Sequence, residues 1–174
     1  MKNNQGGMTF IEVLIALVII VTGILGAVAM QATAKKGSFD AMQRSLASSL
    51  AQDIIERMRN NDRDNLAAYA ANSPYGSGKI SSAPTCNKDT SCSAGQMVTN
   101  DLYGWEQALM GNNAKFEGAG IGLVNAVGCI THAANAVTVV ITWDGRESLV
   151  DGSTESCGGT GTKRRQVQIE AFLY

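Results

Sequence analysis

Hydrophobic and polar positions divide the chain into an apolar stretch near its start and a longer, more polar remainder. Residues 13 to 34 form a run of 22 positions without a charged side chain. A helix of about 20 residues, rising about 1.5 Å per residue, crosses a hydrocarbon core of about 30 Å. We therefore predict a membrane-spanning helix in this part of the chain.

The apolar pattern continues beyond this run with helical spacing, while polar residues such as Gln43 take the other faces. The apolar positions are Phe39, Met42, Leu46, Leu50, Ile54 and Met58. Such a pattern is typical of an amphipathic helix that packs one stripe against a soluble domain. No proline interrupts residues 9 to 60. We therefore predict one helix of about 50 residues, about 75 Å long, that ends near Asn60 and Asn61.

Turn-forming residues follow the helix. Residues 72 to 99 are rich in Gly, Ser, Pro and Asn and are expected to form a connection. Asp101 is expected to cap a short helix that stops at Gly111. Trp105 lies on one side of that helix and is expected in the core.

Alternation with a period of two predicts β-strands in the last third of the chain. Residues 123 to 130 are mostly apolar, while residues 137 to 143 and 166 to 173 alternate and each predict one buried face. Residues 152 to 163 are expected to form an exposed, mobile loop tied at Cys157. The predicted fold class is α+β, with an antiparallel sheet packed on the stripe of the long helix.

The chain length indicates the number of domains, and the net charge indicates whether the protein would attract nucleic acid. The chain has 174 residues, which suits one domain. Its net charge of −1 provides no basic field that would recruit nucleic acid. The basic clusters Lys35-Lys36 and Lys163–Arg165 are expected to lie on solvated surfaces. DNA uptake through the second cluster is a further hypothesis, which salt-dependent binding would test.

Four cysteines lie beyond the apolar run: Cys86, Cys92, Cys129 and Cys157. None belongs to a Cys-x-x-Cys pair, and the single His132 offers little for a zinc site. An even number of cysteines beyond a membrane segment favours two disulfides in an oxidising compartment. Of the three possible pairings we favour Cys86–Cys92 and Cys129–Cys157. Four reduced thiols in a cytosolic protein are the alternative.

The order of features at the N-terminus is unusual. In an ordinary secretory signal, small residues mark a cleavage site after the apolar stretch. Here Gly6-Gly7 precedes it. Cleavage after Gly7 would remove the polar leader and leave the apolar segment in the mature protein. Gly7 suits a scissile bond because it has no side chain to clash with a protease.

Glu12 is an acid near the start of the apolar run. A carboxylate within an apolar helix costs about 2.5–3.5 kcal/mol on insertion scales, so it favours a charged partner. Cleavage would give Met8 a free α-amino group with a pKa of about 7.7–8. In a stack of helices, the amine of a neighbouring subunit is the natural partner of Glu12. The alternative is that Glu12 lies at the headgroup boundary and reaches water.

These residues resemble a known family. Gly-Gly-Met-Thr-Phe-Ile-Glu at 6 to 12, followed by Val-Leu-Ile-Ala-Leu, is similar to the class III leader of type IV prepilins and type II secretion pseudopilins. The resemblance implies cleavage by prepilin peptidase between Gly7 and Met8, N-methylation of Met8, an assembly role for Glu12 and the pilin fold. Major pilins more often have Phe at the new N-terminus, so Met8 favours a minor subunit.

The helix segment from 50 to 61, Leu-Ala-Gln-Asp-Ile-Ile-Glu-Arg-Met-Arg-Asn-Asn, is similar to that of PilV-type minor pilins. Type II secretion pseudopilins of the I class are the near relatives. The expected organisation is a leader at 1–7, a transmembrane or filament-core helix at 8–34, its amphipathic continuation at 35–61, and a periplasmic head at 62–174.

The resulting hypothesis is a minor pilin that primes assembly in a tip or initiation complex and so supports twitching motility and adhesion. Implied partners are other minor pilins, the major pilin, an inner-membrane assembly platform and the prepilin peptidase and methylase. A secretion pseudopilin is the first alternative, and a single-pass membrane-anchored binding module is the second. No catalytic motif, cofactor or metal site is predicted, because His132 has no evident partner and no P-loop or dinucleotide fingerprint is present.

Overall fold

The computed structural model describes residues 7–84, 86, 90–112, 115–116, 119–120, 122–148 and 156–173. The chain forms two compact units, Met1–Phe39 and Asp40–Tyr174. The first unit holds the N-terminal part of helix α1, and the second unit is called the head below. The fold class is α+β, as predicted.

Helix α1 (Phe10–Arg59) is one uninterrupted helix of 50 residues, which confirms the predicted helix length. The carbonyl of Thr9 accepts from the backbone N–H groups of Glu12 and Val13 at its start. At its end, Asn60 Nδ2 donates to the carbonyl of Glu56 at 2.9 Å. The helix therefore ends at the predicted asparagine pair, where a side-chain amide takes over an orphan carbonyl.

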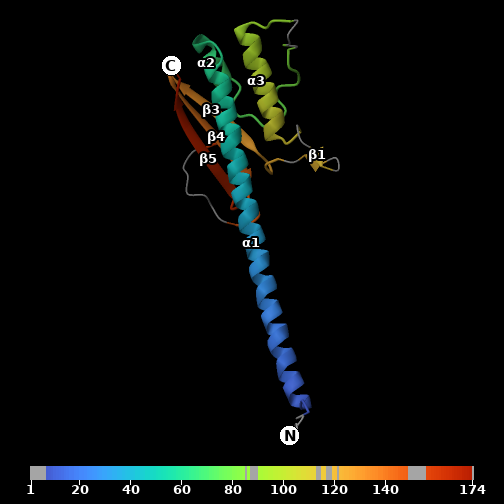
Figure 1. Ribbon diagram of the computed structural model, residues 1–174. Coiled ribbons are helices and arrows are strands. Elements are labelled where there is room, and N and C mark those ends of the chain that lie inside the picture. The colour runs from blue at the N-terminus through green and yellow to red at the C-terminus, as the bar shows by residue number, and fades with distance from the viewer. Residues whose placement is uncertain are drawn as a thin grey trace, which may run out of the picture. The chain divides into compact units, whose positions relative to one another are not determined.

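The head contains a three-stranded antiparallel sheet in the order β3–β4–β5 (Figure 1). Its strands are β3 (Val127–Ala133), β4 (Ala136–Asp144) and β5 (Arg164–Phe172). The short strands β1 (Lys115–Phe116) and β2 (Ala119–Gly120) pair with each other. The helix α1 packs against the three-stranded sheet, and their apolar side chains share one core.

The buried face of α1 in the head differs from the predicted stripe. Its buried residues are Gln43, Ala47, Leu50, Ala51, Ile54, Ile55 and Met58. Met42 and Leu46, predicted to be in the stripe, are 58% and 37% exposed. The helix is turned so that Ala47 and Ala51 face inward. Small side chains allow the helix to pack closely against the sheet. The prediction was wrong here because it placed only large apolar side chains in the buried stripe.

Three further helices precede β1. They are η1 (Arg63–Asn65), α2 (Leu66–Ala70) and α3 (Ala94–Leu109), of which η1 and α2 were not predicted. The predicted connection from 72 to 99 is too long, because α3 begins at Ala94. Ser93 caps α3 in a capping box with Gln96, a signal that the sequence contained.

Three details of α3 were predicted, of which one is wrong and two are confirmed. Asp101 is not the cap, since it is buried inside the helix. Gly111 follows the end of the helix with a φ of +73°, as expected of a stop residue. Trp105 is fully buried, and its Nε1 donates to the carbonyl of Leu50 at 2.8 Å. The expected core position of Trp105 is confirmed.

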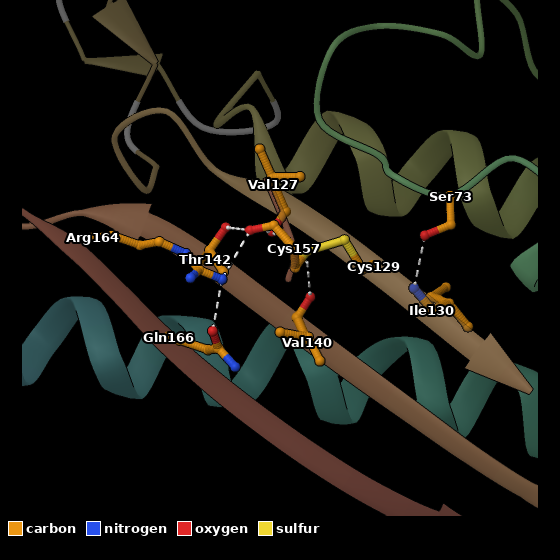
Figure 2. Close-up of a disulfide and its surroundings, with 9 residues drawn as sticks. All are labelled: Ser73, Val127, Cys129, Ile130, Val140, Thr142, Cys157, Arg164 and Gln166. Carbon is orange, nitrogen blue, oxygen red and sulfur yellow. Dashed lines mark hydrogen bonds between the residues drawn. A yellow bond between two sulfur atoms is a disulfide. The ribbon is translucent and has the colours of Figure 1, made fainter. Parts of the chain in front are cut away.

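The strands also differ from prediction in two ways. Strand β3 begins at Val127 rather than at residue 123, because Asn125 adopts a φ of +50° that breaks extended structure. Strand β4 is buried on both faces instead of one, with Val140 and Thr142 at 5% and 3% exposed. The outer face is covered near Cys157, whose carbonyl accepts from Thr142 Oγ1 at 3.0 Å (Figure 2).

Candidate assembly site

The first unit consists of a helix whose apolar side chains are exposed. Large exposed hydrophobics are Met8, Phe10, Ile11, Val13, Leu14, Ile15, Leu17, Val18, Ile19, Ile20, Val21, Ile24, Leu25, Val28 and Met30. Helix α1 is long and apolar enough to cross a membrane, and its most apolar window has no residue buried in the protein. A surface of this kind requires lipid or other helices around it.

Two threonines in this segment form local hydrogen bonds. Thr22 Oγ1 donates to the carbonyls of Val18 at 2.9 Å and Ile19 at 3.0 Å. Thr33 Oγ1 donates to the carbonyl of Ala29 at 3.3 Å. In an apolar medium every polar group needs an internal partner. These bonds make both threonines compatible with a membrane or a packed helix bundle.

Glu12 differs from these two threonines because it carries a charge. It lies in the first turn of α1, where the positive end of the helix dipole favours an acidic side chain. Among the residues that the structure describes, no basic side chain forms a salt bridge with Glu12. Its carboxylate is therefore available to a group outside the described chain.

Gly7 and Met8 precede the helix in exposed, non-helical backbone. A Cβ added at Gly7 would have nothing within 4 Å. The peptide between Gly7 and Met8 is accordingly exposed. Gly6 and the rest of the predicted leader lie outside the described residues.

Comparison with known families agrees with this geometry. Residues 2–28 match the family model described as the prokaryotic N-terminal methylation motif. Residues 29–103 match the family model described as type IV pilin Tt1218. Together the two matches support a type IV pilin-like family for this chain. No curated protein and no solved structure matches it.

These matches agree with a pilin or pseudopilin role, which suggests a structural subunit, and with a membrane-anchored N-terminal helix. The predicted likeness to the PilV type stays a prediction. In the described part of the chain, no group of three or more His, Cys, Asp or Glu residues could hold a metal ion. His132 is half-buried in β3.

The head contains both disulfides that we favoured, Cys86–Cys92 and Cys129–Cys157. Cys157 is 1% exposed. Figure 2 shows its bond to Cys129 of β3 on the outer face of the sheet. The second disulfide thus ties the chain before β5 to β3. Residues 156 and 158 to 163 are largely exposed, as predicted for that loop, while 152 to 155 lie outside the described residues.

The basic cluster before and within β5 is less solvated than expected. Arg165 is 7% exposed and lies 4.0 Å from Asp40, measured from Nη2 to Oδ2. Arg164 is half-buried, and its Nη2 donates to the carbonyl of Cys157 at 3.1 Å. The expectation of a solvated surface is wrong for these two arginines. Their burial also removes support from the DNA-uptake hypothesis.

A buried acid that the sequence analysis missed organises the head. Glu106 of α3 is fully buried, and its carboxylate accepts the backbone N–H groups of five successive residues, Gly76 to Ile80. Burial alone raises the pKa of Glu106, but the backbone N–H donors outweigh it and hold the pKa below its usual value of 4.5. No local pattern indicates this contact, because the acid and the loop are far apart in sequence.

A second buried network joins α1, α2 and α3. The hydroxyl of Tyr69 donates to Asp101 Oδ2 at 2.7 Å, and Arg57 Nη1 lies 3.5 Å from Asp101 Oδ1. Burial and the bond to Asp101 raise the pKa of Tyr69. Burial likewise raises the pKa of Tyr75 to about 12. These groups hold their protons at neutral pH and act as structural anchors of the head.

Proposed function

We propose that this pilin-like chain is a minor pilin of a type IV pilus. The leader 1–7 is removed by prepilin peptidase, and the new N-terminus at Met8 is methylated. The helix 8–34 then anchors the subunit in the inner membrane, with the amphipathic helix 35–61 and residues 62–174 in the periplasm. The observation that carries the proposal is Glu12, an acid without a described partner in an otherwise apolar, exposed helix directly after Gly7.

Assembly follows from the cost of that acid. When helices pack side by side, Glu12 of one subunit pairs with the α-amine of Met8 in its neighbour. Both charges are then neutralised in an apolar bundle, where an unpaired charge is strongly unfavourable. The pair sets the axial register, while the exposed apolar side chains supply the packing.

Met8 in place of the commoner Phe supports a minor subunit. In that role the chain primes the filament in a tip or initiation complex with other minor pilins, on an inner-membrane platform, and the major pilin follows. Filament formation then supports twitching motility and adhesion at the cell surface. A type II secretion pseudopilin would use the same helix and the same acid with different partners, and a membrane-anchored binding module would need neither cleavage nor Glu12.

The first test is the intact mass and N-terminal sequence of the protein recovered from its native membrane. We expect a start at Met8 with one added methyl group and all four cysteines oxidised. A start at Met1 would leave Glu12 without its proposed partner and would favour the anchored module. Recovery of the processed chain from sheared surface filaments, rather than with a secretion system, separates the pilus from the pseudopilus.

Replacement of the acid tests the assembly step. We expect Glu12→Gln to be cleaved and to remain in the membrane but to fall at least about tenfold in sheared filaments, because removal of one member of a buried ion pair costs about 3–5 kcal/mol. Immunoblots of membrane and filament fractions measure this ratio. The matched control is Glu56→Gln, because Glu56 is an exposed acid of the same helix. This variant should enter filaments normally. Normal incorporation of Glu12→Gln would contradict the pairing.

A further inference from the structure

The face of α1 that meets the sheet changes character within the head. Between Ala47 and Met58 its inward residues are apolar and at most 9% exposed. One turn earlier the inward residue is Gln43, an amide at 2% exposure. A dry apolar contact thus gives way to a polar one at the start of the head.

Several buried polar atoms at this place have no hydrogen-bond partner among the described residues. They are Nε2 and Oε1 of Gln43, Nε1 of Trp143 and Oδ1 of Asp40. Trp143 is itself 2% exposed. Buried amides and indoles are normally paired, because each lost water contact must be replaced. The contact between α1 and the sheet is therefore weakened where these atoms lie.

The sheet register shows that these groups share one end of the sheet. Trp143 near the end of β4 is the partner of Arg165 near the start of β5. Arg165 in turn lies 4.0 Å from Asp40, three residues before Gln43 on α1. Residues three apart on a helix lie on the same face. The polar groups thus form one patch between the first turn of α1 in the head and the Trp143–Arg165 end of the sheet.

We propose that this patch is a built-in point of separation, at which residues 40 to 46 of α1 lift from the sheet while Ala47–Met58 stays docked. Separation lets water reach Gln43, Trp143 and Asp40, which the closed state leaves unsatisfied. The apolar contact beyond Ala47 has no comparable gain and stays closed. The rest of the head stays folded during this separation, and the inference rests on the head fold rather than on the proposed function.

Hydrogen exchange of the full chain in detergent micelles tests this inference. A helical turn that has lost its packing opens its hydrogen bonds more often. The amides of residues 44 to 47, whose helical bonds go to the carbonyls of 40 to 43, should therefore exchange at least about tenfold faster than those of 54 to 58. In Gln43→Leu, which removes the unsatisfied amide at similar volume, exchange at 44 to 47 should slow about tenfold, equivalent to about 1.4 kcal/mol.

A matched control separates this effect from added hydrophobicity. Gln52→Leu makes the same change at an exposed position of the same helix and should leave exchange at 44 to 47 unchanged. Equal protection of both segments in the wild-type chain would overturn the inference. It would also be overturned if Gln43→Leu left exchange unchanged or made it faster, because the amide would then be held by an ordered water and would stabilise the contact.

Discussion

Gly128→Ala is expected to destabilise the head by at least about 2 kcal/mol, although it adds one methyl group. A Cβ at Gly128 in β3 would collide with Cη2 of Trp105, and it would lie 2.9 Å from Leu109 Cδ1 and 3.0 Å from Trp105 Cζ3. Trp105 has no room to retreat, since it is fully buried and bonded to the carbonyl of Leu50.

The same substitution would also disturb Tyr75. Gly128 and Tyr75 exchange two backbone hydrogen bonds of 2.7 and 2.9 Å, and the Tyr75 ring meets that of Trp105 edge-on with centroids 5.6 Å apart. Displacement of the indole would therefore loosen the segment that carries Tyr75 as well as α3.

Thermal unfolding of the full chain in detergent, followed by tryptophan fluorescence, measures this effect. A loss of 1 kcal/mol lowers Tm by about 2–4 °C in a chain of this size, so we expect a fall of at least about 4 °C. Gly95→Ala in α3 is the control, because its Cβ would have nothing within 4 Å, and it should be neutral or stabilising by up to about 1 kcal/mol. Equal stability of the two variants would show that Trp105 does not pack on Gly128.

Glu106→Ala is expected to cost about 3 kcal/mol or more. The carboxylate accepts five successive backbone N–H groups, from Gly76 to Ile80, at 2.9 to 3.2 Å. Alanine leaves these donors without their acceptor, and each buried donor left unsatisfied costs about 1–3 kcal/mol unless water replaces the bond. Besides the fall in Tm, we expect amides 76 to 80 to lose their protection from hydrogen exchange.

The same acid gives the head a dependence on pH. Because the pKa of Glu106 is lower in the folded protein than its ordinary value of 4.5, its ionised form stabilises the fold above that pH. This contribution decreases as the pH falls below about 4.5, toward the lowered pKa of the folded state. Glu106→Gln should lose this part of the pH dependence, whereas the exposed control Glu56→Gln should retain it. An unchanged profile in Glu106→Gln would mean that another group is responsible.

Local patterns predicted most of the secondary structure. The long helix appeared as 50 residues without proline and with continuous apolar content, and β4 and β5 appeared as alternating segments close to their observed bounds. The start of α3 could have been found from Ser93 and Gln96, which form a capping box three residues apart. Each of these signals acts between residues close together in the chain.

Parts of the candidate site were likewise predictable from residues close together in the chain. Its N-terminal part, from Gly7 to Glu12, was evident from the order of the residues, because a membrane segment and a cleavage motif act through a short continuous stretch. The sequence also favours both disulfide pairs, although it leaves three pairings open.

The sequence by itself determined the apolar anchor, the acid within it, the fold class and the order of the main strands, because helix length, hydropathy and alternation depend on near neighbours. The tertiary structure alone decided which face of α1 is buried, that β4 is covered on both sides, that Glu106 holds residues 76 to 80, and that Gln43 lies unsatisfied against the sheet. These features depend on which distant segments meet. Burial and hydrogen bonding between such segments depend on tertiary contacts, so a pattern of neighbouring residues does not predict them.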